Sequence, residues 1–164
     1  MPSVSVSRTI AVPQAEVWAA LSDIANARRW NSSWSSIEIT SAQRHGLGTT
    51  FRAHTGDGEA YDFLVTEWDA PDGIAFSPIR DDSERYSITL DSHTFRLHAA
   101  GEGETVIELT ARASVRGVRG RFIGLFFWAG HQKHGLNLAL DSLESIFEPH
   151  QSAAPEPDVA PGGD

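Results

Sequence analysis

The start of the chain reads as a strand joined directly to a helix, and this junction constrains the fold more than any other feature. Residues 3–10 alternate small hydroxyl side chains with larger ones, which is the period of a β-strand. Pro13 ends the hydrogen-bonded ladder because proline has no backbone N–H, and its fixed φ suits the start of a helix. Val17, Leu21 and Ile24 then recur at i, i+4 and i+7. The pattern predicts a strand followed at once by an amphipathic helix.

The middle of the chain predicts an antiparallel meander with glycine-rich turns. After a second short helix at 25–31, we expect strands from about residue 37, over 49–54, 59–69 and 74–79, and along the alternating positions of 86–99 and 107–114. The larger apolar residues fall on even-numbered positions up to Leu90 and on odd-numbered positions from Phe95. This change predicts a bulge or turn near Ser92. The pattern of residues 59–69 does not show which side chains of that strand face inward.

A single long helix is predicted from about residue 118 to 148, where the apolar period becomes helical. The expected stripe comprises Phe122, Leu125, Ala129, Leu136, Leu140, Leu143 and Phe147. Because the strand at 107–114 has one apolar and one polar face, we expect this helix to cover one side of the sheet. Residues 149–164 are rich in proline, glycine and acidic side chains and are predicted to be a disordered tail.

Composition excludes several classes of function. The 164 residues fit one domain, and a net charge of −9 argues against a nucleic-acid partner and against an anionic membrane surface. The absence of cysteine rules out disulfides and thiolate metal sites. No apolar run approaches the ~20 residues of a membrane span, so no stable membrane insertion is expected. The first residues lead straight into a strand, without a secretory signal, which predicts a cytoplasmic protein.

Several short motifs occur in a characteristic order. They are Ala11-Val12-Pro13 with Val17-Trp18, Gly46-Leu47-Gly48-Thr49-Thr50-Phe51, Glu67-Trp68-Asp69-Ala70-Pro71 and His93-Thr94-Phe95-Arg96-Leu97. Together with the long closing helix, they resemble the SRPBCC superfamily of START-related and polyketide cyclase-like proteins. The resemblance implies an α+β helix-grip fold over residues 1–148. In that fold a curved antiparallel sheet of about seven strands wraps a long C-terminal helix, with two short helices after the first strand.

In the resembled family, the space between the sheet and the helix is the ligand cavity. The candidate ligand-binding residues are the aromatic Trp30, Phe51, Phe63, Phe76, Phe95 and Phe126 and the polar Lys133 and Asn137. For each aromatic residue the competing interpretation is ordinary core packing. Lys133 falls near the middle of the predicted helical stripe, where its amine meets either an acidic ligand group or, by extending, solvent or a carboxylate of the sheet.

Five histidines are candidates for metal or acid–base chemistry. His131 and His134 lie three apart on the long helix, half of a metal site without a visible third ligand. Helical geometry turns both away from the stripe, which favours a solvated or dimer-facing pair, and no metal or cofactor is expected. Three further histidines, His54, His93 and His98, are candidates for general acid or base catalysis. The alternation of side chains along the strand, however, turns His98 to the solvent-exposed face. No catalytic residue is assigned.

Three functions remain open at this point. The first is binding of a small hydrophobic molecule, such as a lipid, an isoprenoid or a polyketide-like compound. The second is a polyketide cyclase or aromatase that uses the same cavity, which a converging histidine, carboxylate or tyrosine would favour. The third is a protein-interaction module of the chaperone-activator type, which a filled core would favour. The patch Phe126-Phe127-Trp128 is wider than one helix face buries and suggests a gate to the cavity or a homodimer contact.

Overall fold

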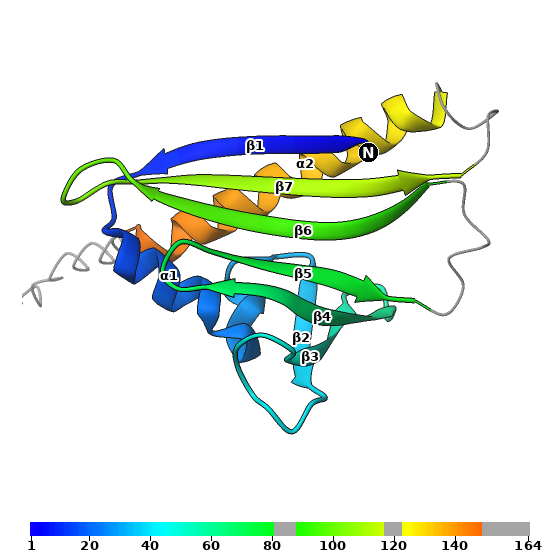
Figure 1. The fold of residues 1–164 in the computed structure, drawn as a ribbon, viewed down its shortest axis with the longest axis horizontal. Helices are drawn as coiled ribbons and strands as arrows, with labels where there is room; N and C mark the ends of the chain where they lie inside the picture. The colour runs from blue at the N-terminus through cyan, green and yellow to red at the C-terminus, as the bar shows by residue number, and fades with distance from the viewer. Residues whose placement is uncertain (81–87, 117–122, 149–164) are drawn as a thin grey trace, which may run out of the picture.

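The computed structural model describes residues 1–80, 88–116 and 123–148 (Figure 1). Its elements are β1 (Ser3–Ile10), α1 (Gln14–Ser22), η1 (Ile24–Arg29), β2 (Trp34–Ile39), β3 (Thr50–Thr55), β4 (Ala60–Asp69), β5 (Gly73–Ile79), β6 (Ile88–Ala99), β7 (Thr105–Val115) and α2 (Ile123–Phe147). The predicted tail at 149–164 and the predicted helix start at residue 118 lie outside the described residues.

One seven-stranded sheet carries the fold. The strands follow the order β1-β7-β6-β5-β4-β3-β2, and every neighbouring pair is antiparallel. In Figure 1 the strands curve, and α2 runs across one face of the β1, β7 and β6 side of the sheet. The predicted α+β helix-grip fold is confirmed, including the two short helices after the first strand.

The first helix is anchored as its sequence pattern predicts. Val17, Leu21 and Ile24 are buried, so the stripe at i, i+4 and i+7 faces the core. Trp18 packs edge-to-face against Trp68 of β4, with ring centroids 5.2 Å apart. The contact attaches α1 to the end of the sheet next to the β4–β5 turn.

Two register shifts decide which side chains of the central strands face inward. The shift predicted near Ser92 is confirmed, because the pairing of β6 with β7 slips between Leu90 and Ser92. A second shift lies in β4, between Val65 and Glu67 of the pairing with β5. That irregularity breaks the two-residue period of β4, which explains why the inward face of 59–69 could not be assigned from its sequence.

Helix α2 packs closely on the sheet through its C-terminal half. Leu136, Ala139, Leu140 and Leu143 are buried there. Nearby, Arg8 of β1 forms ion pairs with Asp141 and Glu144 of the helix, tying it to the edge strand. The N-terminal turns are different, since Phe126 is 81% exposed and Phe127 77% exposed. In the described parts of the chain, no helix is long and apolar enough to cross a membrane.

We predict that Leu143→Ala lowers the free energy of unfolding by about 2–5 kcal/mol, because it opens a cavity at a fully buried contact between α2 and the sheet. Leu138→Ala, on the same helix at a residue that is 38% exposed, is the control and should cost no more than about 0.5 kcal/mol. Urea denaturation followed by circular dichroism measures both. Equal losses would mean that this half of α2 does not hold the fold together.

Candidate ligand-binding site

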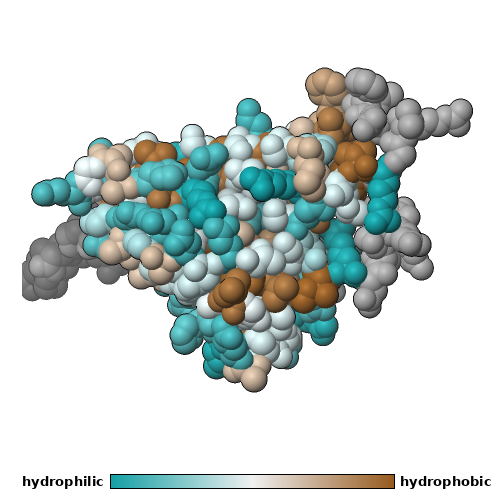
Figure 2. All heavy atoms as spheres, viewed as in Figure 1, coloured by the Kyte–Doolittle hydropathy of each residue, from teal (hydrophilic) through white to brown (hydrophobic). Residues whose placement is uncertain are grey.

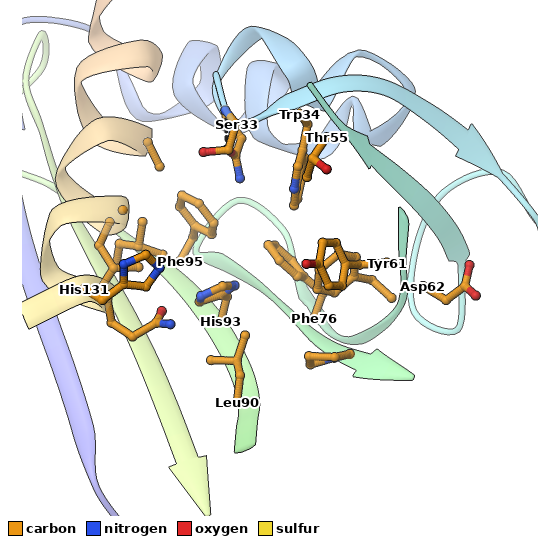
Figure 3. A pocket seen from close by; sticks show the side chains of 18 of the residues that line it. Ser33, Trp34, Thr55, Tyr61, Asp62, Phe76, Leu90, His93, Phe95 and His131 are labelled. Carbon is orange, nitrogen blue, oxygen red and sulfur yellow. Dashed lines mark hydrogen bonds between the residues drawn. The ribbon is translucent and has the colours of Figure 1, made fainter. Parts of the chain in front are cut away.

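A cavity of about 760 Å³ lies between the sheet and α2. Its floor is formed by β4, β5 and β6, one wall by the segment from η1 into β2, and the other wall by α2 from Trp128 to Ala139. Figure 3 shows Trp34, Phe76, Phe95 and His93 turned toward this space, with His131 approaching from the helix. Tyr61 and Ile79, which are 41% and 50% exposed, stand at its mouth.

The apolar wall of the cavity is a set of mutually packed rings. Trp30 lies edge-on to Phe95 at 5.2 Å, and Trp34 contacts Phe63 at 5.6 Å. Phe76 sits at the centre, 5.6 Å from Phe63 and 6.2 Å from Phe95 between ring centroids. Such offset and edge-to-face pairs stabilise one another beyond their burial. The wall is therefore held by its own contacts and does not require a ligand to keep its shape.

One polar atom of this wall is left without a partner. The indole Nε1 of Trp30 is buried and makes no hydrogen bond to any residue that the structure describes. A buried unpaired donor costs about 1–3 kcal/mol.

The predicted aromatic residues divide into two groups. Trp30, Phe63, Phe76 and Phe95 line the cavity, as expected. Phe51 lies behind the lining, fully buried and stacked on Phe63 at 5.3 Å, and it supports the wall from the core side. Whether any of them contacts a ligand stays a prediction.

The remaining predicted residues are not among those that line the cavity, and whether they contact a ligand stays a prediction. Phe126 is exposed on the first turns of α2, Lys133 is exposed, and the Asn137 carboxamide donates a hydrogen bond to the Lys133 carbonyl oxygen at 2.9 Å. The physical reason is the helical phase. At 100° per residue, the face turned to the cavity is centred near Gln132 and Gly135, and Lys133 is rotated away from it.

The histidine pair of α2 is also split. Both histidines are exposed, which fits the expected solvated pair, but His131 also lines the cavity whereas His134 lies outside the lining. Among the described residues, no three histidine, cysteine, aspartate or glutamate side chains are grouped to hold a metal ion.

His93, one of the predicted candidates for acid–base chemistry, is the one of that group of three that lines the cavity. It follows the β6 bulge and shares the parity of Phe95, so it faces the cavity, and its ring lies 5.6 Å from Phe76. The sequence contains a signal for this placement, because the alternation of side chains along the strand that turns His98 outward turns His93 inward. The structure agrees for His98, which is exposed.

Two other ionisable groups at the cavity, Asp62 and Tyr61, are already engaged. Asp62 accepts two hydrogen bonds of 2.8 Å from Arg52, which lower the pKa of that carboxyl. The Tyr61 hydroxyl donates to Glu59, and this bond raises the pKa of the phenol. Both groups therefore keep their ordinary charge states at neutral pH, and neither is suited to exchange a proton with a ligand.

His93 differs from Asp62 and Tyr61 because desolvation, and not a bond to a charged partner, is the main cause of its shifted pKa. Burial lowers its pKa from 6.5 to about 4, and its hydrogen-bonding interaction with the Gln132 side chain acts in the opposite direction without compensating. At neutral pH the imidazole is uncharged, with one nitrogen that donates and one that accepts.

The lowered pKa predicts a pH effect on stability. Between pH 6.5 and about 4 the unfolded chain binds a proton at His93 that the folded protein excludes, so stability falls as the pH falls through this range. We expect His93→Gln, which cannot titrate, to remove on the order of 2 kcal/mol of this loss. Urea denaturation at pH 7 and at pH 4.5 measures it. Identical pH profiles for the two proteins would contradict the assignment.

Proteins of known structure share this fold at low sequence identity. A START superfamily protein from Mycobacterium smegmatis aligns over 88% of this chain and 95% of its own, with a TM-score of 0.69 and 16% identity. The di-domain ARO/CYC protein BexL of the BE-7585A biosynthetic pathway aligns over 91% of this chain and 48% of its own, with a TM-score of 0.73 and 14% identity. Norcoclaurine synthase from Thalictrum flavum, in complex with dopamine and hydroxybenzaldehyde, aligns over 92% and 88%, with a TM-score of 0.69 and 16% identity.

The sequence itself matches one known protein family over most of its length. Among curated proteins no match was found. The profile of one family, described as polyketide cyclase / dehydrase and lipid transport, matches residues 1–148. This range covers every strand and helix of the structure and agrees with the START-like neighbours. The chain therefore belongs to the polyketide cyclase / dehydrase and lipid transport family.

Proposed function

We propose that this protein binds a small hydrophobic molecule in the cavity between the sheet and α2. The observation that carries the proposal is the cavity itself, about 760 Å³ with a wall of packed aromatic rings. Ligand sites typically enclose about 300–1,000 Å³ and are lined mainly by apolar and aromatic side chains. A lipid, an isoprenoid or a polyketide-like compound fits this description, and apolar burial at about 25 cal/mol per Å² supplies the driving force.

A polyketide cyclase or aromatase activity is the second candidate, and one observation favours it. His93 stands inside the cavity with an uncharged imidazole, beside Phe76 of the aromatic wall and next to Gln132. A neutral imidazole in a shielded site accepts a proton from a bound substrate or polarises its carbonyl oxygen by a hydrogen bond. The structural neighbour BexL carries the ARO/CYC description, which is in keeping with this candidate.

The interaction-module hypothesis receives less support. We expected it to accompany a filled core, and the space between α2 and the sheet is not filled. A cytoplasmic location, the lack of a nucleic-acid partner and a homodimer through Phe126 and Phe127 stay predictions from the sequence.

Two glycines of α2 provide a matched test of the binding site. Gly135 lines the cavity, and a Cβ built there meets no atom within 4 Å, so Gly135→Phe should place a ring in the cavity without a clash at its base. We expect this variant to weaken binding of the neutral fluorescent probe N-phenyl-1-naphthylamine at least tenfold. The readout is the rise in probe fluorescence on titration.

Gly130→Phe is the control, because Gly130 has equally open surroundings on the same helix but does not line the cavity. Both variants should fold at least as well as the parent, since replacing glycine by phenylalanine raises the helix propensity at that position. Retained binding in Gly135→Phe, or equal loss in the two variants, would count against the cavity as the binding site.

The natural ligand is sought by native mass spectrometry of the protein purified from its own host. We expect a stoichiometric hydrophobic molecule to remain bound to the parent protein and to be depleted in Gly135→Phe. Protein that is empty, and that shows no thermal shift with a panel of lipids, sterols and polyketides, would argue against a carrier role.

A further inference from the structure

Besides the unpaired Nε1 of Trp30, the cavity holds two facing polar side chains, His93 and Gln132, that are not committed to other neighbouring side chains. At its β3–β4 end, Asp62 is bonded to Arg52, and the Thr55 hydroxyl is bonded to Asp57 and to the Glu59 carbonyl oxygen. At the η1–β2 end, the Asn31 side-chain oxygen accepts from the Ser33 backbone N–H. Within the part of the chain that the structure describes, no side chain other than the partner in this pair forms a hydrogen bond with His93 or Gln132.

These two residues come from opposite sides of the cavity. His93 is on β6 of the sheet, directly after the bulge, and Gln132 is on the cavity face of α2. An uncharged imidazole offers one donor and one acceptor, and a carboxamide offers two donors and an acceptor oxygen. Even with one bond between them, a donor and an acceptor remain free for a ligand placed between sheet and helix.

The surroundings of this pair disfavour a charged ligand group. The adjacent rings of Phe76 and Phe95 offer no compensating charge, and of the two charged side chains among the described lining residues, Asp62 is paired and Arg80 is exposed at the mouth. An ionised carboxylate or ammonium buried without a partner costs several kcal/mol, whereas a hydroxyl or carbonyl oxygen loses only hydrogen bonds that the pair can replace.

We propose that His93 and Gln132 together recognise one uncharged oxygen, a hydroxyl or carbonyl, on an otherwise aromatic or polycyclic ligand, and so select neutral ligands over acids of the same shape. This inference rests on the proposed function, because it concerns the chemistry of a ligand bound in the same cavity. It assigns the two residues a positioning role in specificity.

Three probes of one skeleton test it: naphthalene, 2-naphthol and 2-naphthoate, each measured by displacement of N-phenyl-1-naphthylamine at pH 7.5. We expect 2-naphthol to bind at least about threefold more tightly than naphthalene, as one or two neutral hydrogen bonds allow. We expect 2-naphthoate to bind at least tenfold more weakly than 2-naphthol. In His93→Leu and in Gln132→Leu, the preference for 2-naphthol over naphthalene should disappear while naphthalene binding persists.

Persistent naphthalene binding shows that each variant remains folded with an intact cavity. His98→Leu is the matched control, since His98 lies on the same strand but is exposed, and it should keep the parent's preferences. Equal binding of naphthalene and 2-naphthol by the parent would overturn the inference and leave the proposed function standing. Tightest binding of 2-naphthoate would overturn it in favour of an acid held at Arg80. No binding of any probe, N-phenyl-1-naphthylamine included, would overturn the proposed function as well.

Discussion

The cavity depends on the way α2 packs against the sheet along only part of its length. Leu136, Leu140 and Leu143 are buried against the sheet, and Arg8 of the edge strand ties the same half of the helix through Asp141 and Glu144. A twisted, curved sheet cannot follow a straight helix over 25 residues. The N-terminal half of α2 therefore stands away from β4 and β5, and the separation becomes the ligand cavity.

The apolar wall resists collapse into that space because its rings support one another. Phe76 contacts Trp30, Trp34 and Phe63, and Phe51 backs the set from the core. Figure 2 shows that hydrophobic side chains also reach the surface of the molecule, and the exposed Phe126 lies on the helix that borders the cavity. The site is thus a continuation of the hydrophobic core that has been left open on one side.

The placement of His93 in the site depends on a single irregularity in β6. Without the shift between Leu90 and Ser92, the parity set by Leu90 would continue through Ser92 and Thr94, and His93 would face away from the helix. The bulge places the imidazole among aromatic rings, where burial keeps it uncharged at neutral pH. In this way a local feature of the backbone changes the chemistry that an apolar cavity can offer to a ligand.

The sequence by itself determined the element order, the apolar stripe of α1, the bulge near Ser92 and the aromatic candidates Trp30 and Phe76, because local periodicity and turn chemistry report them directly. Tertiary structure alone decided that Lys133 lies off the cavity and that His131 and Gln132 lie on it. The apolar stripe of α2 gives the helix phase only where the helix is buried. Where it borders an open space, polar and small residues take the inner positions, and periodicity no longer distinguishes the face toward the cavity from the face toward solvent.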